Sequence, residues 1–256
     1  MILSISTIIL AAGQGKRMKS DLAKVLHLLH GKTLLSYVVA TAKAVGSPDI
    51  TVIVGHQADA VLEAFRNQGL TFVKQGALLG TGHAVLQARE KFEHYTGVVL
   101  ILCGDVPLLR PATVRSLFSH HSAENNEVTV LTTRLAHPAG YGRIITGKEG
   151  QVLRIVEERD ATEAEREVNE INTGIYCVNS KFLFEALMMV KNNNAQQEYY
   201  LTDIIAIAHE HGYRVGRLIA ADHREVMGIN TLPELEQAHR YLQEVRGGMG
   251  ACNEIR

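Results

Sequence analysis

The chain has 256 residues, 46% of them hydrophobic and 21% charged, and its formal net charge is −1. This length can bury the core of one large α/β domain, while the balanced charge excludes the global positive field that recruits nucleic acid or an anionic membrane. The cysteines, Cys103, Cys177 and Cys252, form no C-x-x-C pair, which argues against a disulfide framework or a zinc site. With no signal-like N-terminus and no apolar run of about 18 residues, the sequence predicts a cytoplasmic protein.

The first predicted strand, residues 5–9, leads into a loop suited to phosphate. The loop and its flank carry two glycines and three cations: Gly13, Gly15, Lys16, Arg17 and Lys24. The glycines let backbone N–H groups approach a ligand, and the cations match phosphate oxygens. The spacing fits neither a Walker loop nor the dinucleotide fingerprint, which needs glycine at Met18. A plain turn beside a solvated basic cluster is the alternative.

Hydrophobic periodicity predicts alternating helices and strands after this loop: helix 33–45, strand 50–54, helix 58–67 and strand 70–73. This alternation implies a parallel sheet with right-handed crossovers and ligands at the carboxyl ends of its strands. Gln75 follows the last of these strands, and Gly80-Thr81-Gly82 opens a helix that extends to about residue 93. An ordinary N-cap explains these glycines, although the Gln75 amide can pair with a base edge.

The most apolar predicted strand, residues 98–102, ends at Cys103-Gly104-Asp105. Gly104 permits close approach of a ligand, and Asp105 offers hard oxygen to a cation such as Mg²⁺. The alternative is that Asp105 caps the helix or turn before Pro107.

Beyond residue 125 the pattern changes to mainly strands, predicted at 128–135, 143–146, 152–158, 171–178 and 215–220. Helices are predicted at 182–190, 199–211 and 233–246, and residues 160–167 form a charged, solvated helix or loop. We interpret this region as an extension of the sheet that forms a smaller, strand-rich lobe.

Four polar or glycine positions in this region are candidates for ligand contacts. Gly140 and Glu157, taken alone, are features of a turn and of the surface. Asn172 interrupts an apolar strand, so its amide is either satisfied by neighbouring backbone or directed at a polyhydroxyl ligand. Residues 231–234 have capping-box spacing, which leaves Asn230 free to be a second cation ligand, or to serve in an ordinary turn.

The histidine pairs His120-His121 and His209-x-His211 lack the i, i+4 spacing of a zinc helix. We therefore expect structural or surface roles for them.

The first loop and seven further blocks, in order, span nearly the whole chain: residues 10–18, 75 with 80–84, 104–108, 140–144, 155–157, 170–175, 192–203 and 228–230. They resemble nucleotidyltransferases that make nucleotide sugars. The resemblance is greatest to the uridyltransferase half of the bifunctional N-acetylglucosamine-1-phosphate uridyltransferase/glucosamine-1-phosphate acetyltransferase family.

The resemblance implies a Rossmann-like α/β fold with a mostly parallel central sheet flanked by helices, the nucleotide-diphospho-sugar transferase fold. It implies one nucleotidyltransferase domain at 1–246 with a sugar-binding lobe at roughly 126–225. A C-terminal tail follows at 247–256, and we expect the left-handed β-helix acetyltransferase domain to be absent. The implied reaction is Mg²⁺-dependent transfer of UMP from UTP to N-acetylglucosamine-1-phosphate, giving UDP-N-acetylglucosamine for cell-wall precursors and pyrophosphate by in-line attack.

The resemblance also implies roles for individual residues. It assigns uridine to Leu10, Ala11, Ala12, Gly13, Gln75 and Gly80, the sugar to Thr81, Gly140, Glu157 and Asn172, Mg²⁺ to Asp105 and Asn230, and phosphate charge to Arg17 and Lys24. Cys103 and Gly104 complete the set of substrate-binding residues. Related chains often carry a larger residue where this chain has Cys103, so we expect its main chain, rather than its thiol, to be important for function. Ala23 stands where the family usually has proline before the lysine, so looser anchoring of Lys24 is expected.

Two other functions stay open at this stage. One is a UTP- or dTTP-dependent pyrophosphorylase for another sugar phosphate, such as glucose-1-phosphate. The other is a non-catalytic nucleotide-sugar sensor, which does not need Asp105 and Asn230 together with Arg17 and Lys24. The sequence makes no prediction of oligomeric state.

Overall fold

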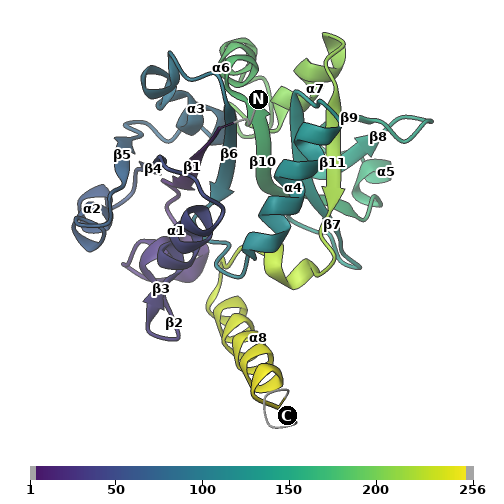
Figure 1. The fold of residues 1–256 in the computed structure, drawn as a ribbon. Helices are drawn as coiled ribbons and strands as arrows, with labels where there is room; N and C mark the ends of the chain where they lie inside the picture. Colours follow the sequence, from purple (N-terminus) through teal and green to yellow (C-terminus); the bar gives the residue numbers. More distant parts are fainter. Residues whose placement is uncertain (1–3, 252–256) are drawn as a thin grey trace.

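The computed structural model describes residues 4–251, and in this part of the chain nine strands form one mixed sheet (Figure 1). The strand order is β11-β7-β10-β6-β1-β4-β5, and β8 pairs with both β10 and β9. The strands are β1 (Ile5–Ala11), β4 (Ile50–Val54), β5 (Thr71–Lys74), β6 (Val98–Cys103), β7 (Val128–Arg134), β8 (Arg143–Thr146), β9 (Val152–Val156), β10 (Glu170–Asn179) and β11 (Val215–Ile219). A separate hairpin joins β2 (Leu28–Leu29) to β3 (Lys32–Thr33).

The two halves of the sheet differ in strand direction. In the first half, β1 pairs in parallel with β4 and β6, and β4 pairs in parallel with β5, which confirms the predicted parallel arrangement. In the second half, β10 runs antiparallel to both β6 and β7, while β11 is parallel to β7. The strand-rich region is therefore continuous with the first half through the β6–β10 pairing, as the predicted sheet extension requires.

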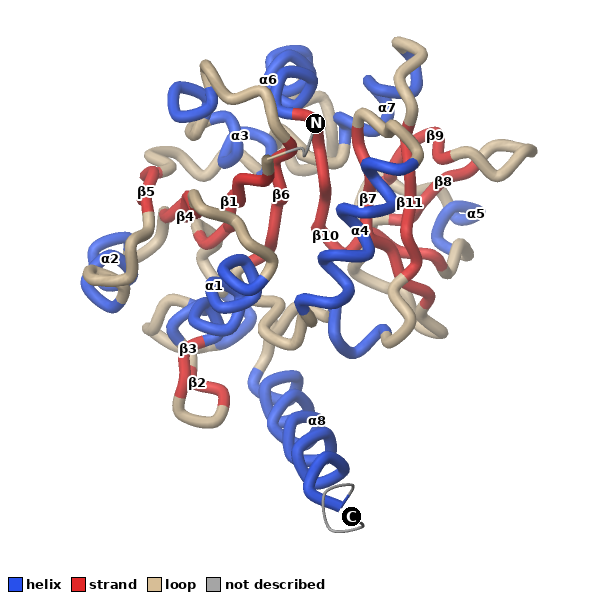
Figure 2. Tube along the Cα trace, in the orientation of Figure 1, coloured by secondary structure: helices blue, strands red, loops and turns tan. Residues whose placement is uncertain are grey.

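Helices cover both faces of the sheet (Figure 2). They are α1 (Leu34–Ala44), α2 (Ala58–Ala64), α3 (Thr81–Leu86), α4 (Pro111–Ala123), α5 (Glu163–Arg166), α6 (Ser180–Met189), α7 (Asp203–Glu210) and α8 (Leu232–Ala251). Side chains of α1, α2 and α4 pack in one hydrophobic core, and those of α3, α6 and α7 pack in another. Because the two cores use alternate residues of β1 and β6, these strands are apolar on both faces.

Several helices differ from the sequence prediction. Helix α7 begins at residue 203 rather than 199, and α2 ends at residue 64 rather than 67. The helix expected to reach residue 93 tightens after α3 into a 3₁₀ turn at Arg89–Phe92, where the N–H of Ala88 bonds to Val85 O. Helix α4 is outside the predicted elements. Its buried positions are the apolar Val114 and Leu117 and the polar His121, so its apolar stripe is too short to predict a helix. Helix α8 continues to Ala251, five residues beyond its predicted end.

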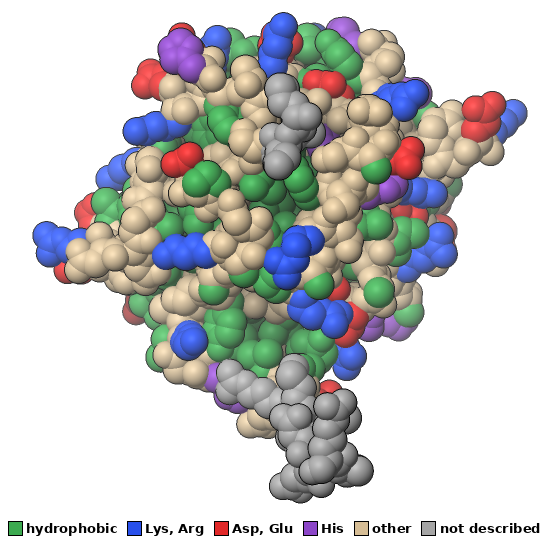
Figure 3. Space-filling model, in the orientation of Figure 1, with side chains coloured by type: hydrophobic (Ala, Val, Ile, Leu, Met, Phe, Trp, Pro, Cys, Tyr) green, Lys and Arg blue, Asp and Glu red, His purple; other side chains and the backbone are tan. Residues whose placement is uncertain are grey.

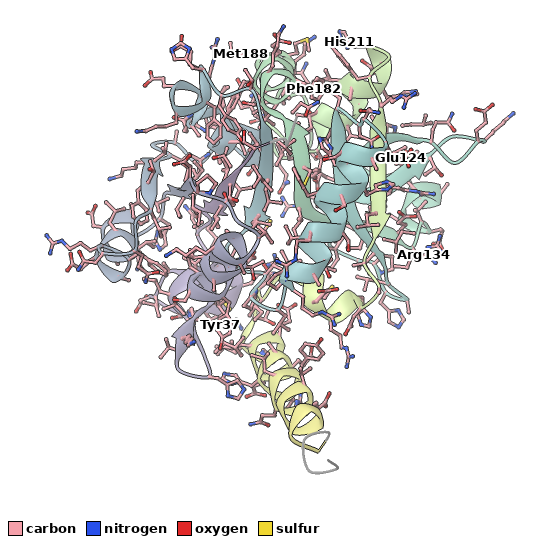
Figure 4. The ribbon with its side chains drawn as sticks, viewed as in Figure 1. Tyr37, Glu124, Arg134, Phe182, Met188 and His211 are labelled. Atoms are coloured by element: carbon pink, nitrogen blue, oxygen red, sulfur yellow. The ribbon has the colours of Figure 1, made fainter. Side chains whose placement is uncertain are left out.

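Helix α8 extends away from the sheet beside the β2–β3 hairpin (Figure 1). A small core of Leu29, Leu34, Ile229 and Ala238 secures its first turns. Tyr37, labelled near α8 in Figure 4, packs against this core and donates from its hydroxyl to Leu29 O at 2.8 Å. The segment that precedes α8 is thereby held against the first half of the chain.

Charged side chains of both signs are mixed over the face drawn in Figure 3, in keeping with the balanced composition. Among residues 4–251, the helices are too short or too polar to span a lipid bilayer.

An ion pair between the half-exposed Arg110 and the buried Glu225 anchors the 3₁₀ turn His223–Val226 to the start of α4. The Glu225 carboxylate is 1% exposed and accepts hydrogen bonds from the guanidinium and N–H of Arg110 and from the Thr113 hydroxyl, at 2.9–3.2 Å. Burial of a carboxylate costs free energy, and it is tolerated when its oxygens are paired in this way. This contact fixes the chain shortly before Asn230.

We expect Arg110→Met to lower the free energy of unfolding by about 2 kcal/mol, because it leaves the buried Glu225 carboxylate short of its charged donor. Urea unfolding measures the change. Arg66→Met is the matched control: it removes an exposed Arg66–Glu63 pair and is expected to change stability by less than about 0.5 kcal/mol. Equal effects of the two substitutions would contradict this account.

Candidate active site

A cleft of about 720 Å³ lies where β1, β5 and β6 end. Its lining includes much of the predicted site: Leu10, Ala11, Ala12, Gly13, Arg17, Lys24, Gln75, Gly80, Thr81, Cys103 and Asp105. Strands β6, β1, β4 and β5 pair in parallel in that order, so their carboxyl ends meet at one edge of the sheet. Leu10 and Ala11 belong to β1 itself rather than to the loop, and the register places Leu10 opposite Cys103.

Gly15 controls how closely the first loop approaches Lys24. Its φ of +62° lies in the left-handed region, and a Cβ there would stand 2.9 Å from the Cβ of Lys24. Glycine is therefore required both by the backbone conformation and by the contact. The result is a loop that folds over the lysine and keeps it at the cleft.

Lys24, Asp105, Asn230 and Arg17 converge at one end of the cleft, and we name them the four-residue cluster. The Lys24 ammonium contacts Asp105 Oδ2 and donates to Asn230 Oδ1 at 3.0 Å. Arg17 donates to the same Asn230 oxygen at 2.9 Å. The side chains of Lys24 and Asp105 are only 16% and 18% exposed, so their attraction is less screened than that of a surface pair.

The capping box predicted at residues 231–234 is present and holds Asn230 in place. The N–H of Thr231 donates to Glu234 Oε2 at 2.9 Å, and the N–H of Glu234 donates to the Thr231 hydroxyl at 3.3 Å. Glu234 also accepts from the backbone N–H of Asn230. The Asn230 side chain takes no part in the cap and joins the cluster instead.

Ala23, where the resemblance led us to expect proline, is held by Gln57. The N–H of Ala23 donates to Gln57 Oε1 at 2.6 Å, and the Gln57 amide donates to Asp21 O. Proline lacks an N–H and cannot make the first of these bonds. The segment before Lys24 thus has a tertiary anchor that the sequence analysis did not anticipate.

Five of the predicted site residues are absent from the lining of the cleft: Gly104, Gly140, Glu157, Asn172 and Asn230. Of these, Glu157 and Asn172 connect to lining residues through neighbours, Glu157 to Thr81 and Asn172 through Gly174 to Cys103. Thr202 donates to Glu157 at 3.0 Å, and the adjacent residue, Leu201, donates its N–H to the Thr81 hydroxyl at 3.0 Å. Burial raises the pKa of Glu157, and nearby carboxylates add to the rise. Gly140 is exposed and donates its N–H to a neighbouring carboxylate, Glu158, at 3.0 Å.

The Asn172 amide oxygen accepts from Gly174 N and from the Tyr176 hydroxyl, both at 2.9 Å. The sequence left two possibilities for this amide, hydrogen bonds to neighbouring groups or contact with a ligand. The amide oxygen makes hydrogen bonds to neighbouring groups. Within residues 4–251 the Asn172 side-chain nitrogen has no protein partner. It remains the atom of this side chain that can contact a ligand.

The thiol of Cys103 donates to Gly174 O at 3.4 Å, and burial raises its pKa to about 12. It is therefore a neutral side chain at ordinary pH. The main chain beside it is structurally important, since Gly104 donates its N–H to Leu10 O at 2.9 Å. Cys177 is buried and free, while Cys252 lies outside the described residues.

Several residues in or beside the cleft were missed by the sequence analysis: Gln14, Gln57, Leu78, His83, Gln196 and Glu198. Gln196 and Glu198 belong to a segment that was treated as shaping the lobe. That segment is joined to the Gly80 turn, because Tyr199 donates its N–H to Leu79 O and accepts from Gly82 N, both at 2.8 Å. A Cβ on Gly80 would lie 2.6 Å from Tyr199 O, so this approach needs glycine.

The histidine pairs are remote from this site. The His121 ring is buried, with Nδ1 2.9 Å from the Thr129 hydroxyl, so it has a structural role. His209 and His211 are exposed, and Figure 4 shows His211 beyond the end of α7.

The sheet is mixed, and the edge formed by its parallel strands carries a glycine-containing loop, cations and a carboxylate–amide pair. This combination of fold and site is typical of a nucleotidyltransferase. A crystal structure of UDP-glucose pyrophosphorylase complexed with UDP-glucose shares this fold, with a TM-score of 0.74 and 17% identity over 95% of this chain and 99% of that one. Residues 7–170 match the model of the MobA-like NTP transferase domain, and the chain belongs to this family.

Two relatives are bifunctional proteins GlmU. The protein from Geobacter metallireducens is 49% identical over 241 residues, which cover 94% of this chain and 51% of the relative. The protein from Desulfotalea psychrophila is 45% identical over 239 residues, which cover 93% and 70%. The chain spans about half the length of most of the curated relatives it matches.

The carboxylates around Glu157 generate a testable pH dependence. Burial, with a contribution from Asp160, raises the pKa of Asp203 from 3.8 to about 6. The native state therefore holds an extra proton between about pH 4 and pH 6, and its stability falls as the pH rises through this window.

We expect Asp203→Asn to raise the free energy of unfolding by about 1 kcal/mol at pH 7, after allowing for partial solvent screening, because asparagine needs no buried charge. The gain should disappear near pH 4, where the aspartate is protonated. Urea unfolding at several pH values measures it, with exposed Glu210→Gln on the same helix as the control. A gain independent of pH would rule out the titration of Asp203.

Proposed function

We propose that the chain catalyses transfer of a uridylyl group from UTP to N-acetylglucosamine-1-phosphate, releasing pyrophosphate and forming UDP-N-acetylglucosamine. The single observation that carries this proposal is the four-residue cluster, which joins two cations to a carboxylate and an amide oxygen at one end of the cleft. The GlmU relatives support the choice of sugar and nucleotide. We further propose that residues 1–246 act as one domain, with the sugar held by the part at 126–225.

The residues of the cluster fit a magnesium ion. The Lys24 ammonium lies between Asp105 Oδ2 and Asn230 Oδ1, so a cation already marks the point where these two hard oxygens converge. Magnesium commonly takes one or two protein oxygens and completes its shell with phosphate and water. Bound to these oxygens, it would supply charge neutralisation for the reacting phosphates.

The chain's own contribution to the reaction is positional. The attacking sugar-phosphate oxygen is already an anion and requires no general base. Two polyanions must instead be held in line, and their repulsion must be offset as charge develops on phosphorus. Arg17 and Lys24 supply that positive charge, while the glycine-containing loop presents backbone N–H groups to the nucleotide phosphates.

The first test is pyrophosphate release from UTP and N-acetylglucosamine-1-phosphate, with and without Mg²⁺. We expect Mg²⁺-dependent release that is faster than with glucose-1-phosphate. Preference for glucose-1-phosphate would change the substrate and retain the mechanism. Nucleotide-sugar binding without release from either sugar phosphate would favour the sensor.

We expect Asp105→Asn to lower kcat for pyrophosphate release by about 100-fold or more, because it removes the charged cation ligand while preserving the side chain's shape. Steady-state kinetics at saturating Mg²⁺ measure the loss. The control is Asp59→Asn on the exposed surface of α2, which should leave kcat unchanged. Retention of wild-type turnover by Asp105→Asn would overturn the metal assignment.

Lys24 competes with the proposed metal for the same oxygens, so its removal should separate metal binding from catalysis. We expect Lys24→Met to bind Mn²⁺ several-fold more tightly in the absence of substrates, and to release pyrophosphate more slowly. Electron paramagnetic resonance of free Mn²⁺ measures the affinity. Lys16→Met, which removes another cation of the same loop, controls for loss of charge alone, and equal tightening in both variants would contradict direct competition.

A further inference from the structure

His83 lies behind Gln75, which lines the cleft, and neither the proposed chemistry nor the assigned contacts use it. Gln75 is buried, and its side-chain nitrogen lies 3.1 Å from Gly80 O and 2.9 Å from His83 Nδ1. One amide nitrogen therefore meets two neighbours that both lie on the protein side of the residue. This arrangement determines which atom Gln75 can offer to a ligand.

The two neighbours fix the orientation of the Gln75 amide. Gly80 O is a carbonyl and can only accept, so the amide must present its NH₂ group to it. The second amide hydrogen then points to His83 Nδ1, which accepts it and leaves the ring proton on Nε2. On that side His83 faces the half-buried Gln87, whose amide nitrogen lies 3.2 Å from Nε2 and 3.2 Å from the His83 carbonyl oxygen. A proton on Nε2 requires this amide to turn and give up its bond to the carbonyl, whereas Gln75 keeps both of its shorter contacts.

With both amide hydrogens used, Gln75 offers the cleft an acceptor. Its Oε1 accepts no hydrogen bond from residues 4–251. This oxygen is not one of the fully buried unpaired atoms, so a ligand can reach it. The ligand group that complements such an oxygen is an N–H donor. Uracil and thymine carry N–H at ring position 3, whereas cytosine has a bare acceptor nitrogen there.

We infer that His83 is a positioning residue that locks the Gln75 amide with its oxygen toward the base, and thereby selects uracil or thymine nucleotides over cytosine nucleotides. This inference rests on the proposed function for the use of a pyrimidine nucleotide. Sites built to hydrogen-bond one partner reject an analogue that leaves a buried polar group unpaired. Without His83, Gly80 O alone opposes rotation of the amide, and the rotated amide would present NH₂ to cytosine.

The test compares UTP with CTP in wild-type protein, His83→Leu and His83→Asn. Leucine fills space and offers no acceptor, so the ratio of kcat/KM for UTP to that for CTP should fall about fivefold to tenfold. The change should appear in KM, with kcat for UTP largely kept. Asparagine can return an acceptor oxygen near the position of Nδ1 and should recover most of the ratio.

Two controls distinguish positioning from loss of structure. Gln87→Met removes the contact on the Nε2 side of the ring and should leave the ratio unchanged. Thermal unfolding of each variant reports whether it folds, and a fall in stability that leaves the ratio at its wild-type value would overturn the inference. So would equal losses for both nucleotides, or failure of His83→Asn to recover a ratio lost in folded His83→Leu.

Calorimetric binding of UTP and CTP in the absence of sugar phosphate separates this inference from the proposed function. If no sugar phosphate yields pyrophosphate, the proposed reaction fails, yet a preference for UTP that weakens in His83→Leu would still support His83. Wild-type protein that binds both nucleotides equally would contradict the assignment of Gln75 as an acceptor.

Discussion

The position of the Lys24 ammonium between the Asp105 carboxylate and the Asn230 amide oxygen depends on most of the structure around the cleft. The bond from Arg17 to Asn230 joins residues 213 positions apart in the chain. Lys24 is placed by Gly15 and Gln57, Asp105 by the end of β6, and Asn230 by the cap of α8. Because each anchor comes from a different element, the cluster forms only when both halves of the sheet are assembled.

The carboxylates in and beside the cleft fall into two groups, which differ in whether a cation compensates their charge. Asp105 meets a cation directly, so its charge is compensated in the absence of ligand. Around Glu157 and Asp203, burial brings carboxylates together without a basic partner among their hydrogen bonds in residues 4–251, and their pKa values rise. Such uncompensated polarity lowers the stability of the fold, and it is typical of surfaces that bind polar ligands. This second region lies on the side where we propose that the sugar binds.

Local patterns in the sequence predicted those parts of the fold that depend on neighbouring residues. The run from Ile5 to Ile9, the parallel first half and the capping box after Asn230 follow from apolar periodicity and fixed spacing. The contacts of Gln57 and His83 did not follow, because each lies at a strand exit or helix start whose partner comes from another segment. The antiparallel β10 likewise depends on long-range pairing that no short pattern specifies.

Alanine stands before Lys24, where the resemblance led us to expect proline, and the rigidity of the first loop originates instead from a tertiary contact. Proline restricts the chain in the unfolded and folded states alike, so it contributes order before any tertiary contact exists. Here the restraint is a hydrogen bond from Ala23 to Gln57, which stands at the start of α2 with φ of +53°. Local opening of the first turn of α2 would release that bond. The order of the loop that carries Lys24 is thereby coupled to the thermal fluctuations at the start of α2, a helix that contributes none of the four residues of the cluster.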